Sequence, residues 1–249
     1  MFESFMYMFK DRSFIKKYLL VLLFVTIANL FMNWSGIYAP ILNDGQTSIL
    51  YYLLYIIGYV IMFVPFGYSI EVLRHTLTDS ENTELPKVSV LQNFLAGFKV
   101  ILSGAVLIFA LFIVFTLLGF INTMLPATIG DITSSIIFTL SLLILFFTSF
   151  FGIAMCSRYV VKPSFLNFVN FKACIGVIEN NILRYSKAYL KTALLAIIVY
   201  GLSIIFVSFL VKLSYTGLVI YSILVSLMWS YVLFVLAKIF AKAVDIEKL

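Results

Sequence analysis

The side chains that most often carry catalysis and metal binding are scarce in this sequence. His75 is the single histidine, and Cys156 and Cys174 are the two cysteines. Structural zinc usually takes four Cys or His ligands, and a zinc-dependent protease needs the two histidines of a His-Glu-x-x-His helix. Neither set of ligands can be assembled from these residues, so we predict no metal site and no cofactor.

The long apolar runs of the chain, given below, contain no Asp, Glu, Lys, Arg or His. Ionisable groups inside the bilayer are the parts from which proton relays and ion-coupled transporters are built. A serine protease acting within the membrane would also need a histidine or lysine there to activate its nucleophile. We therefore expect a protein that is not an enzyme, and we disfavour ion-coupled transport.

Charged side chains at the edges of the apolar runs are the remaining candidates for a site. Glu71, Arg74 and His75 are spaced to share one helical face, as in a docking or lipid-headgroup site or, more simply, a local ion pair at a solvated helix end. Further candidates for headgroup contact are Lys99, Lys172, Arg184 and Lys187.

Ser222, Ser226 and Ser230 recur at intervals of four within the last apolar run. Small residues at this spacing let two helices approach closely, and their hydroxyls can bond a neighbouring helix. We predict a helix-packing face. The alternative is a polar lining for a substrate path.

Composition indicates which kind of structure must position all these residues. Of the 249 residues, 63% are hydrophobic and only 11% are charged, whereas a soluble domain carries about 25% charged residues. We predict one all-α membrane domain over residues 1–249, a polytopic bundle of about six transmembrane helices. The expected spans, each near the ~20 residues that cross a bilayer, are 18–38, 49–70, 100–124, 132–155, 192–211 and 216–237.

The distribution of positive charge predicts the orientation. Sixteen of the seventeen Lys and Arg residues fall in the N-terminal segment, in two long loops or in the C-terminal tail, and only Lys212 lies in the other loops. Positive residues concentrate in cytoplasmic loops. We predict a multi-pass cell-membrane protein with both termini cytoplasmic, whose cations face anionic headgroups rather than nucleic acid.

Three segments with helical apolar spacing precede pairs of spans. We predict cytoplasmic interfacial amphipathic helices over about residues 2–12, 86–99 and 166–187. Each would open a unit of one interfacial helix and a two-span hairpin. Alternatively, these segments are amphipathic only because they flank spans.

Several short motifs carry a resemblance to a known family. They are Asp11 with Phe14-Ile15-Lys16-Lys17, Gly67-Tyr68 leading to Arg74, Leu85-Pro86, and Phe94 with Gly97-Phe98-Lys99. With them the chain resembles a prokaryotic, largely archaeal set of six-span integral membrane proteins classed only as a domain of unknown function. Lys87-Val88 departs from the acidic-aromatic pair that often follows the proline in that family. The resemblance implies fold and location, and it brings no activity.

Two functions remain open. The first is a non-enzymatic scaffold or accessory component that contacts lipids or membrane-protein partners through its cytoplasmic helices. The second is the permease subunit of an export system driven by a separate ATPase, in which residues 86–99 would be the coupling helix. An ATPase that co-purifies with this protein would favour the second.

Overall fold

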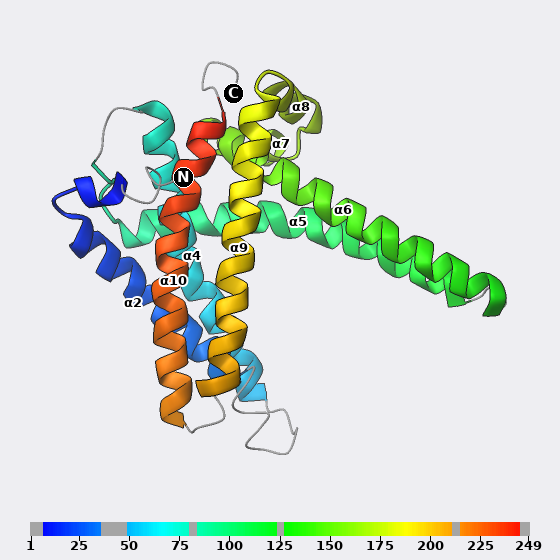
Figure 1. The fold of residues 1–249 in the computed structure, drawn as a ribbon, viewed down its shortest axis with the longest axis horizontal. Coiled ribbons are helices and arrows are strands. Elements are labelled where there is room, and N and C mark those ends of the chain that lie inside the picture. The colour runs from blue at the N-terminus through cyan, green and yellow to red at the C-terminus, as the bar shows by residue number, and fades with distance from the viewer. Residues whose placement is uncertain (1–6, 36–48, 80–83, 124–126, 211–214, 245–249) are drawn as a thin grey trace.

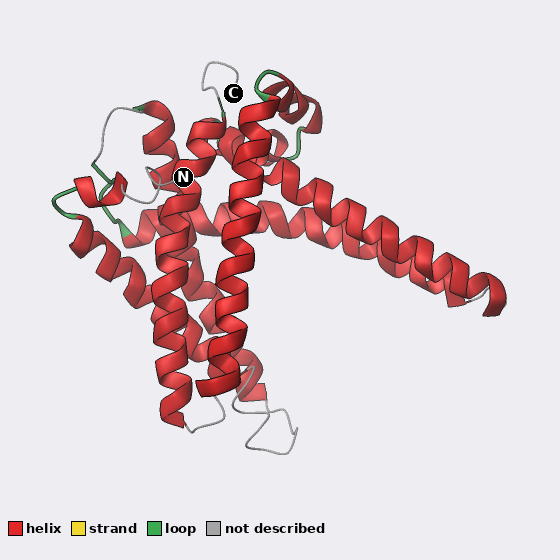
Figure 2. Ribbon diagram, in the orientation of Figure 1, coloured by secondary structure: helices red, strands yellow, loops and turns green. Residues whose placement is uncertain are grey.

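The computed structural model describes residues 7–35, 49–79, 84–123, 127–210 and 215–244. Every regular element in these ranges is helical, which confirms the predicted all-α fold (Figure 2). The elements, in chain order, are η1 (Tyr7–Lys10), α2 (Phe14–Asn33), α4 (Ile49–Thr78), α5 (Val90–Thr123), α6 (Ala127–Val161), α7 (Phe165–Phe168), α8 (Phe171–Glu179), α9 (Ile182–Leu210) and α10 (Tyr215–Ala243).

Six of these helices are long and apolar enough to cross a membrane, as predicted: α2, α4, α5, α6, α9 and α10. The shortest, α2, has 20 residues, which at 1.5 Å per residue matches a hydrocarbon core of about 30 Å. Large apolar side chains along these helices are exposed, among them Phe109, Ile197 and Phe209. Such a surface is compatible with lipid and not with water.

Helix α10 packs against α2, α4 and α9 and stands beside α9 in Figure 1. In its most apolar window 56% of the residues are buried, against 28% or less in the other five helices. Helix α5 crosses this group along α4 and then leaves it, paired with α6, as a long hairpin (Figure 1). The six helices therefore form a four-helix core with a projecting hairpin rather than six parallel rods.

Aromatic rings fill the interior of the core. Phe234 of α10 contacts the rings of Phe14, Tyr18 and Tyr68, with centroids 5.5–6.3 Å apart. The contacts with Phe14 and Tyr68 are edge-on, and such contacts stabilise beyond the area that they bury. These ring contacts join α2, α4 and α10 at the end of the molecule that lies near η1.

The helix boundaries differ from the sequence prediction mainly at one end in four of the spans, and at both ends in α2 and α6. Helix α4 continues through Pro65 to Thr78 instead of ending near residue 70. Proline removes one backbone hydrogen bond from a helix but need not end it when the surrounding packing holds the chain. Pro65 is buried among such contacts. Glu71, Arg74 and His75 thus belong to the helix itself.

The three predicted interfacial helices need correction. Residues 90–99 of the predicted 86–99 segment are the first turns of α5, because their apolar periodicity runs unbroken into the span. The predicted 166–187 helix is three pieces: α7, α8 and the start of α9, with an N-cap at Asn170 and a helix end at Asn180. Asparagine side chains favour helix ends because they bond nearby backbone groups. Of the predicted 2–12 helix, residues 7–10 form a 3₁₀ turn, and residues 1–6 lie outside the described ranges.

Candidate functional site

A buried carboxylate joins the N-terminal segment to the stretch between α4 and α5. Asp11 accepts hydrogen bonds from Lys17 Nζ at 2.8 Å and from the Leu85 backbone N–H at 2.9 Å. Lys17 Nζ also donates to the Leu85 carbonyl oxygen. The Asp11 side chain is 4% exposed. We call Asp11, Lys17 and Leu85 the N-terminal clasp.

The electrostatics of the clasp favour an ionised Asp11. Burial by itself raises the pKa of this carboxyl group, because it disfavours the charged form. The hydrogen bonds from Lys17, from the Ser13 hydroxyl and from the Leu85 and Ser13 backbones outweigh burial and lower the pKa below its usual range. The carboxylate is therefore charged at neutral pH and contributes to the stability of the fold.

Two further bonds secure the same region. Tyr68 of α4 donates its hydroxyl to the Pro86 carbonyl at 2.9 Å. Arg74, one turn and a half further along α4, pairs with Glu71 at 2.6 Å and donates through Nε to the Val160 carbonyl at 3.2 Å. Val160 lies in the last turn of α6, where carbonyl groups lack helical partners. Arg74 thus ties the end of α6 to α4.

The crossing of α4 and α5 depends on two glycines. A Cβ atom added to Gly67 would lie 1.6 Å from the Asn93 carbonyl oxygen, and one added to Gly97 would lie 1.9 Å from the Phe63 carbonyl oxygen. No real side chain fits at such distances. The ring of Phe63 packs between those of Phe94 and Phe98, with both centroid distances 5.6 Å. Residues from the family-like motifs therefore meet at one structural junction, which holds the N-terminal segment, α4, α5 and α6 together.

The serine face of α10 lies against α2. Ser222, Ser226 and Ser230 are fully buried. Asn29 donates to the Ser226 hydroxyl at 2.9 Å, and Asn33 donates to the Ser222 hydroxyl at 3.0 Å. Interhelical bonds between amides and hydroxyls stabilise helix pairs in lipid. The structure thus places the serines at a helix contact.

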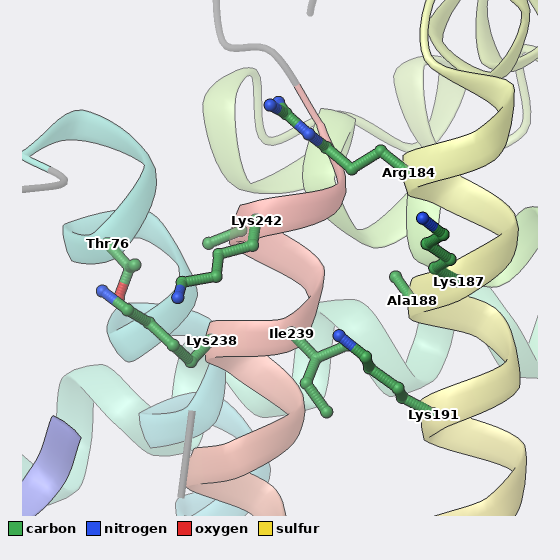
Figure 3. Close-up of a pocket in the computed structure, with 9 residues that line it drawn as sticks. Thr76, Arg184, Lys187, Ala188, Lys191, Lys238, Ile239 and Lys242 are labelled. Atoms are coloured by element: carbon green, nitrogen blue, oxygen red, sulfur yellow. The ribbon is translucent and has the colours of Figure 1, made fainter. Parts of the chain in front are cut away.

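The most distinctive polar feature is a basic cavity near the α8 end of α9, bounded by α9, α10 and the end of α4 (Figure 3). Its volume is about 420 Å³. Five of its nine lining residues are cationic and none is acidic; the lining consists of Thr76, Arg184, Lys187, Ala188, Lys191, Lys238, Ile239, Ala241 and Lys242.

Helical spacing explains why the lining of this cavity is basic. Arg184, Lys187 and Lys191 follow one another at intervals of three and four on α9, and Lys238 and Lys242 stand four apart on α10. Residues at these intervals share a helix face. Figure 3 shows Arg184 and Lys191 extending from α9 toward α10, while Lys238 points toward Thr76 of α4. The backbone brings together cations that are about fifty residues apart in the sequence.

The predicted headgroup contacts are only partly gathered here. Arg184 and Lys187 line the cavity. Lys99 on α5 and Lys172 on α8 are exposed and do not line it, and Glu71 and Arg74 pair with each other on α4 next to half-buried His75. Sequence reasoning did not select Lys191, Lys238 or Lys242. The signal available in the sequence was helical spacing: Lys191 follows Lys187 by four residues, and Lys242 follows Lys238 by four residues.

The two cysteines lie in different surroundings. Cys174 of α8 is completely buried, and burial raises the pKa of its thiol, an effect that the nearby Arg158 opposes. Cys156 of α6 is partly exposed and lines a second, apolar cavity of about 270 Å³ with residues of α4, α5 and α10. Within the described ranges, no three His, Cys, Asp or Glu side chains are grouped as metal ligands would be.

Six helices that are long and apolar enough to cross a membrane define an integral, multi-pass membrane protein of the all-α class. The chain belongs to the family described as protein of unknown function (DUF4013), whose model matches residues 50–212. The match runs from the start of α4 to just past α9. It includes the Gly67–Gly97 crossing and the α9 side of the basic cavity, and it ends before α10. Comparison with curated proteins and with solved structures found no significant match.

Proposed function

We propose that this protein is a non-enzymatic accessory component or scaffold of the cell membrane that binds anionic lipid headgroups on the cytoplasmic side. The observation that carries the proposal is the basic cavity, where five cations from two transmembrane helices line one space without an acidic neighbour in the lining. Each cation near an anionic bilayer surface gains about 1 kcal/mol. The distribution of Lys and Arg along the chain supports a cytoplasmic location for this end, with both termini on the same side.

Thermal unfolding of the purified full-length protein in neutral detergent tests this proposal. Added phosphatidylglycerol should raise the melting temperature more than phosphatidylcholine does, and the difference should shrink as salt is added, because salt screens charge. The double variant Lys187→Gln, Lys191→Gln should lose most of the difference. Lys99→Gln, Lys172→Gln is the matched control, since it removes two exposed cations outside the cavity and should keep the difference.

Two outcomes would contradict the proposal. Equal stabilisation by the neutral and the anionic lipid would exclude headgroup binding through charge. An equal loss of the effect in the control variant would mean that the whole surface charge, and not the cavity, attracts the lipid.

A permease subunit of an ATPase-driven exporter is the second candidate function. One observation favours it: the first turns of α5 present Leu91 and Leu95 to the surface, 70% and 46% exposed, while Gly97 fixes the same segment of the helix on α4. An exposed apolar face on a rigidly held helix is a suitable contact for a partner. Co-purification of an ATPase with the wild type, abolished by Leu91→Ser, would favour this function over the first.

A further inference from the structure

We infer that the apolar cavity between α4, α5, α6 and α10 holds part of an acyl chain of a bilayer lipid. This cavity has a volume of about 270 Å³ and shares no lining residue with the basic cavity. All four helices of its lining are among the six that can span the membrane. The inference goes beyond the proposed function, because it concerns a hydrocarbon chain and does not depend on headgroup charge.

The first argument is the way in which the cavity forms. Gly97 brings α5 into backbone contact with α4, and Val100 and Ile101, the α5 residues of the lining, follow one turn later. Beyond this point the α5–α6 hairpin leaves the core (Figure 1). On the α10 side the lining includes Ala237, which has only a methyl group to offer. The crossing therefore leaves a space between hairpin and core that the lining side chains do not fill.

The second argument is the chemistry of the lining. Nine of its eleven residues carry hydrocarbon side chains, and the other two are Ser69 and Cys156. The Ser69 hydroxyl already donates to the Phe66 carbonyl oxygen of its own helix at 2.7 Å, and a thiol is a weak hydrogen-bonding group. A buried water usually makes about three hydrogen bonds to polar groups, and this lining does not supply them. A hydrocarbon chain needs none, and it restores the dispersion contacts that an empty space lacks.

The third argument is the surface next to the cavity. Phe66 lines the cavity and is also 38% exposed, and Leu102, which follows Ile101, is 51% exposed. The cavity thus borders the apolar surface that these helices present to the bilayer, where acyl chains are the surrounding medium. A cavity of about 150 Å³ admits a benzene ring, so the larger space here can take several methylene groups of a flexible chain.

A chain in this position would contact the hairpin and the core together. Helices α4 and α10 form one side of the cavity, and α5 and α6 form the other. Direct contact between α6 and α10 is slight. The lipid chain would therefore supply packing between α6 and α10 that the protein itself largely lacks.

Photocrosslinking of the full-length protein in vesicles of phosphatidylcholine tests the inference. The probe is a phosphatidylcholine with a diazirine in the middle of one acyl chain, and adducts are mapped by peptide mass spectrometry after irradiation. We expect adducts on the lining residues Ile101 and Cys156 in addition to those on exposed Phe109. Ala237→Phe places a ring in the cavity and should remove only the lining adducts. Ala241→Phe, one turn further along α10 and outside this cavity, is the matched control.

A second measurement uses the wild-type protein and needs no substitution. The thiol of Cys156 belongs to the lining, so its rate of labelling by the small, membrane-permeant N-ethylmaleimide reports whether the cavity is occupied. In a detergent that has a rigid ring system and no free alkyl chain, added phosphatidylcholine should slow this labelling. Glycerophosphocholine, the same headgroup without its chains, should leave the rate unchanged. Peptide mass spectrometry separates Cys156 from the fully buried Cys174.

Three results would overturn the inference. The first is a set of adducts confined to exposed residues. The second is labelling of Cys156 that phosphatidylcholine does not slow, or that glycerophosphocholine slows equally. The third is an equal loss of lining adducts in Ala241→Phe and Ala237→Phe, which would place the effect outside the cavity. If Ala237→Phe does not fold, the labelling of the wild type decides by itself. Phosphatidylcholine has no net charge, so failure here would leave the proposed binding of anionic headgroups standing.

Discussion

Gly67 and Gly97 face each other where α4 and α5 cross, and each presses its backbone on the partner helix. The Cβ positions of the two residues fall 1.6 Å and 1.9 Å from carbonyl oxygens of the other helix. This approach is closer than any side chain permits. It sets the angle at which the α5–α6 hairpin leaves the core.

Gly97→Ala should destabilise the protein, because the added methyl group must push α5 away from α4. Overpacking of this kind costs about 1–3 kcal/mol or more. Gly104→Ala on the same helix is the matched control, since nothing lies within 4 Å of its Cβ position. There the substitution should be neutral or stabilising, because alanine favours the helix over glycine by up to about 1 kcal/mol. Thermal unfolding in detergent measures both, and equal melting temperatures for the two variants would contradict the crossing geometry.

Asp11 should make stability depend on pH in the acid range. Its pKa in the folded protein lies below that of the unfolded chain. The carboxylate therefore stabilises the fold fully at pH values above the unfolded pKa, about 4, and this contribution declines as the pH falls further. Asp11→Asn should lower the free energy of unfolding by about 1–3 kcal/mol at neutral pH and should flatten the acid dependence. A variant as steeply acid-sensitive as the wild type would show that other carboxyl groups dominate.

The serine face offers a matched pair of substitutions. Ser226→Ala removes the acceptor of the Asn29 amide and leaves that amide unpaired at a buried contact, so it should destabilise by about 0.6–2 kcal/mol. The buried Ser230 hydroxyl has no hydrogen-bond partner among the described residues. Ser230→Ala should accordingly be neutral or slightly stabilising. Comparable losses in both variants would indicate that the face acts through its shape alone.

Membrane topology can be tested through Lys172, which is exposed on α8. Native Cys174 is fully buried and should therefore react slowly with maleimides. With Lys172→Cys, a membrane-impermeant maleimide should label inside-out vesicles and leave intact cells unlabelled. The wild-type protein measures the background from Cys156 and Cys174. Labelling of the variant from outside intact cells would reverse the predicted orientation and move the basic cavity away from the cytoplasm.

Local patterns were sufficient to predict the class of protein and the six spans. Hydropathy over about twenty residues depends only on neighbouring positions, so each apolar run could be recognised by itself. Because such patterns depend only on neighbouring residues, they also explain the errors in the predicted boundaries between interfacial helices and spans. Periodicity over residues 90–99 and 182–187 could not show where an interfacial helix ends and a span begins, because one helix continues through both.

The amino-acid sequence by itself determined that this chain is a helical membrane protein, because burying its apolar runs in lipid is the one arrangement that removes them from water. Only the tertiary structure decided which distant residues meet. Asp11 binds Leu85 across 74 positions, Gly67 contacts the helix of Gly97, and Arg184, Lys187 and Lys191 share a cavity with Lys238 and Lys242. These contacts depend on how α2, α4, α5, α9 and α10 pack against one another. Packing is set by the shapes of whole helix faces, which no single segment of the sequence contains.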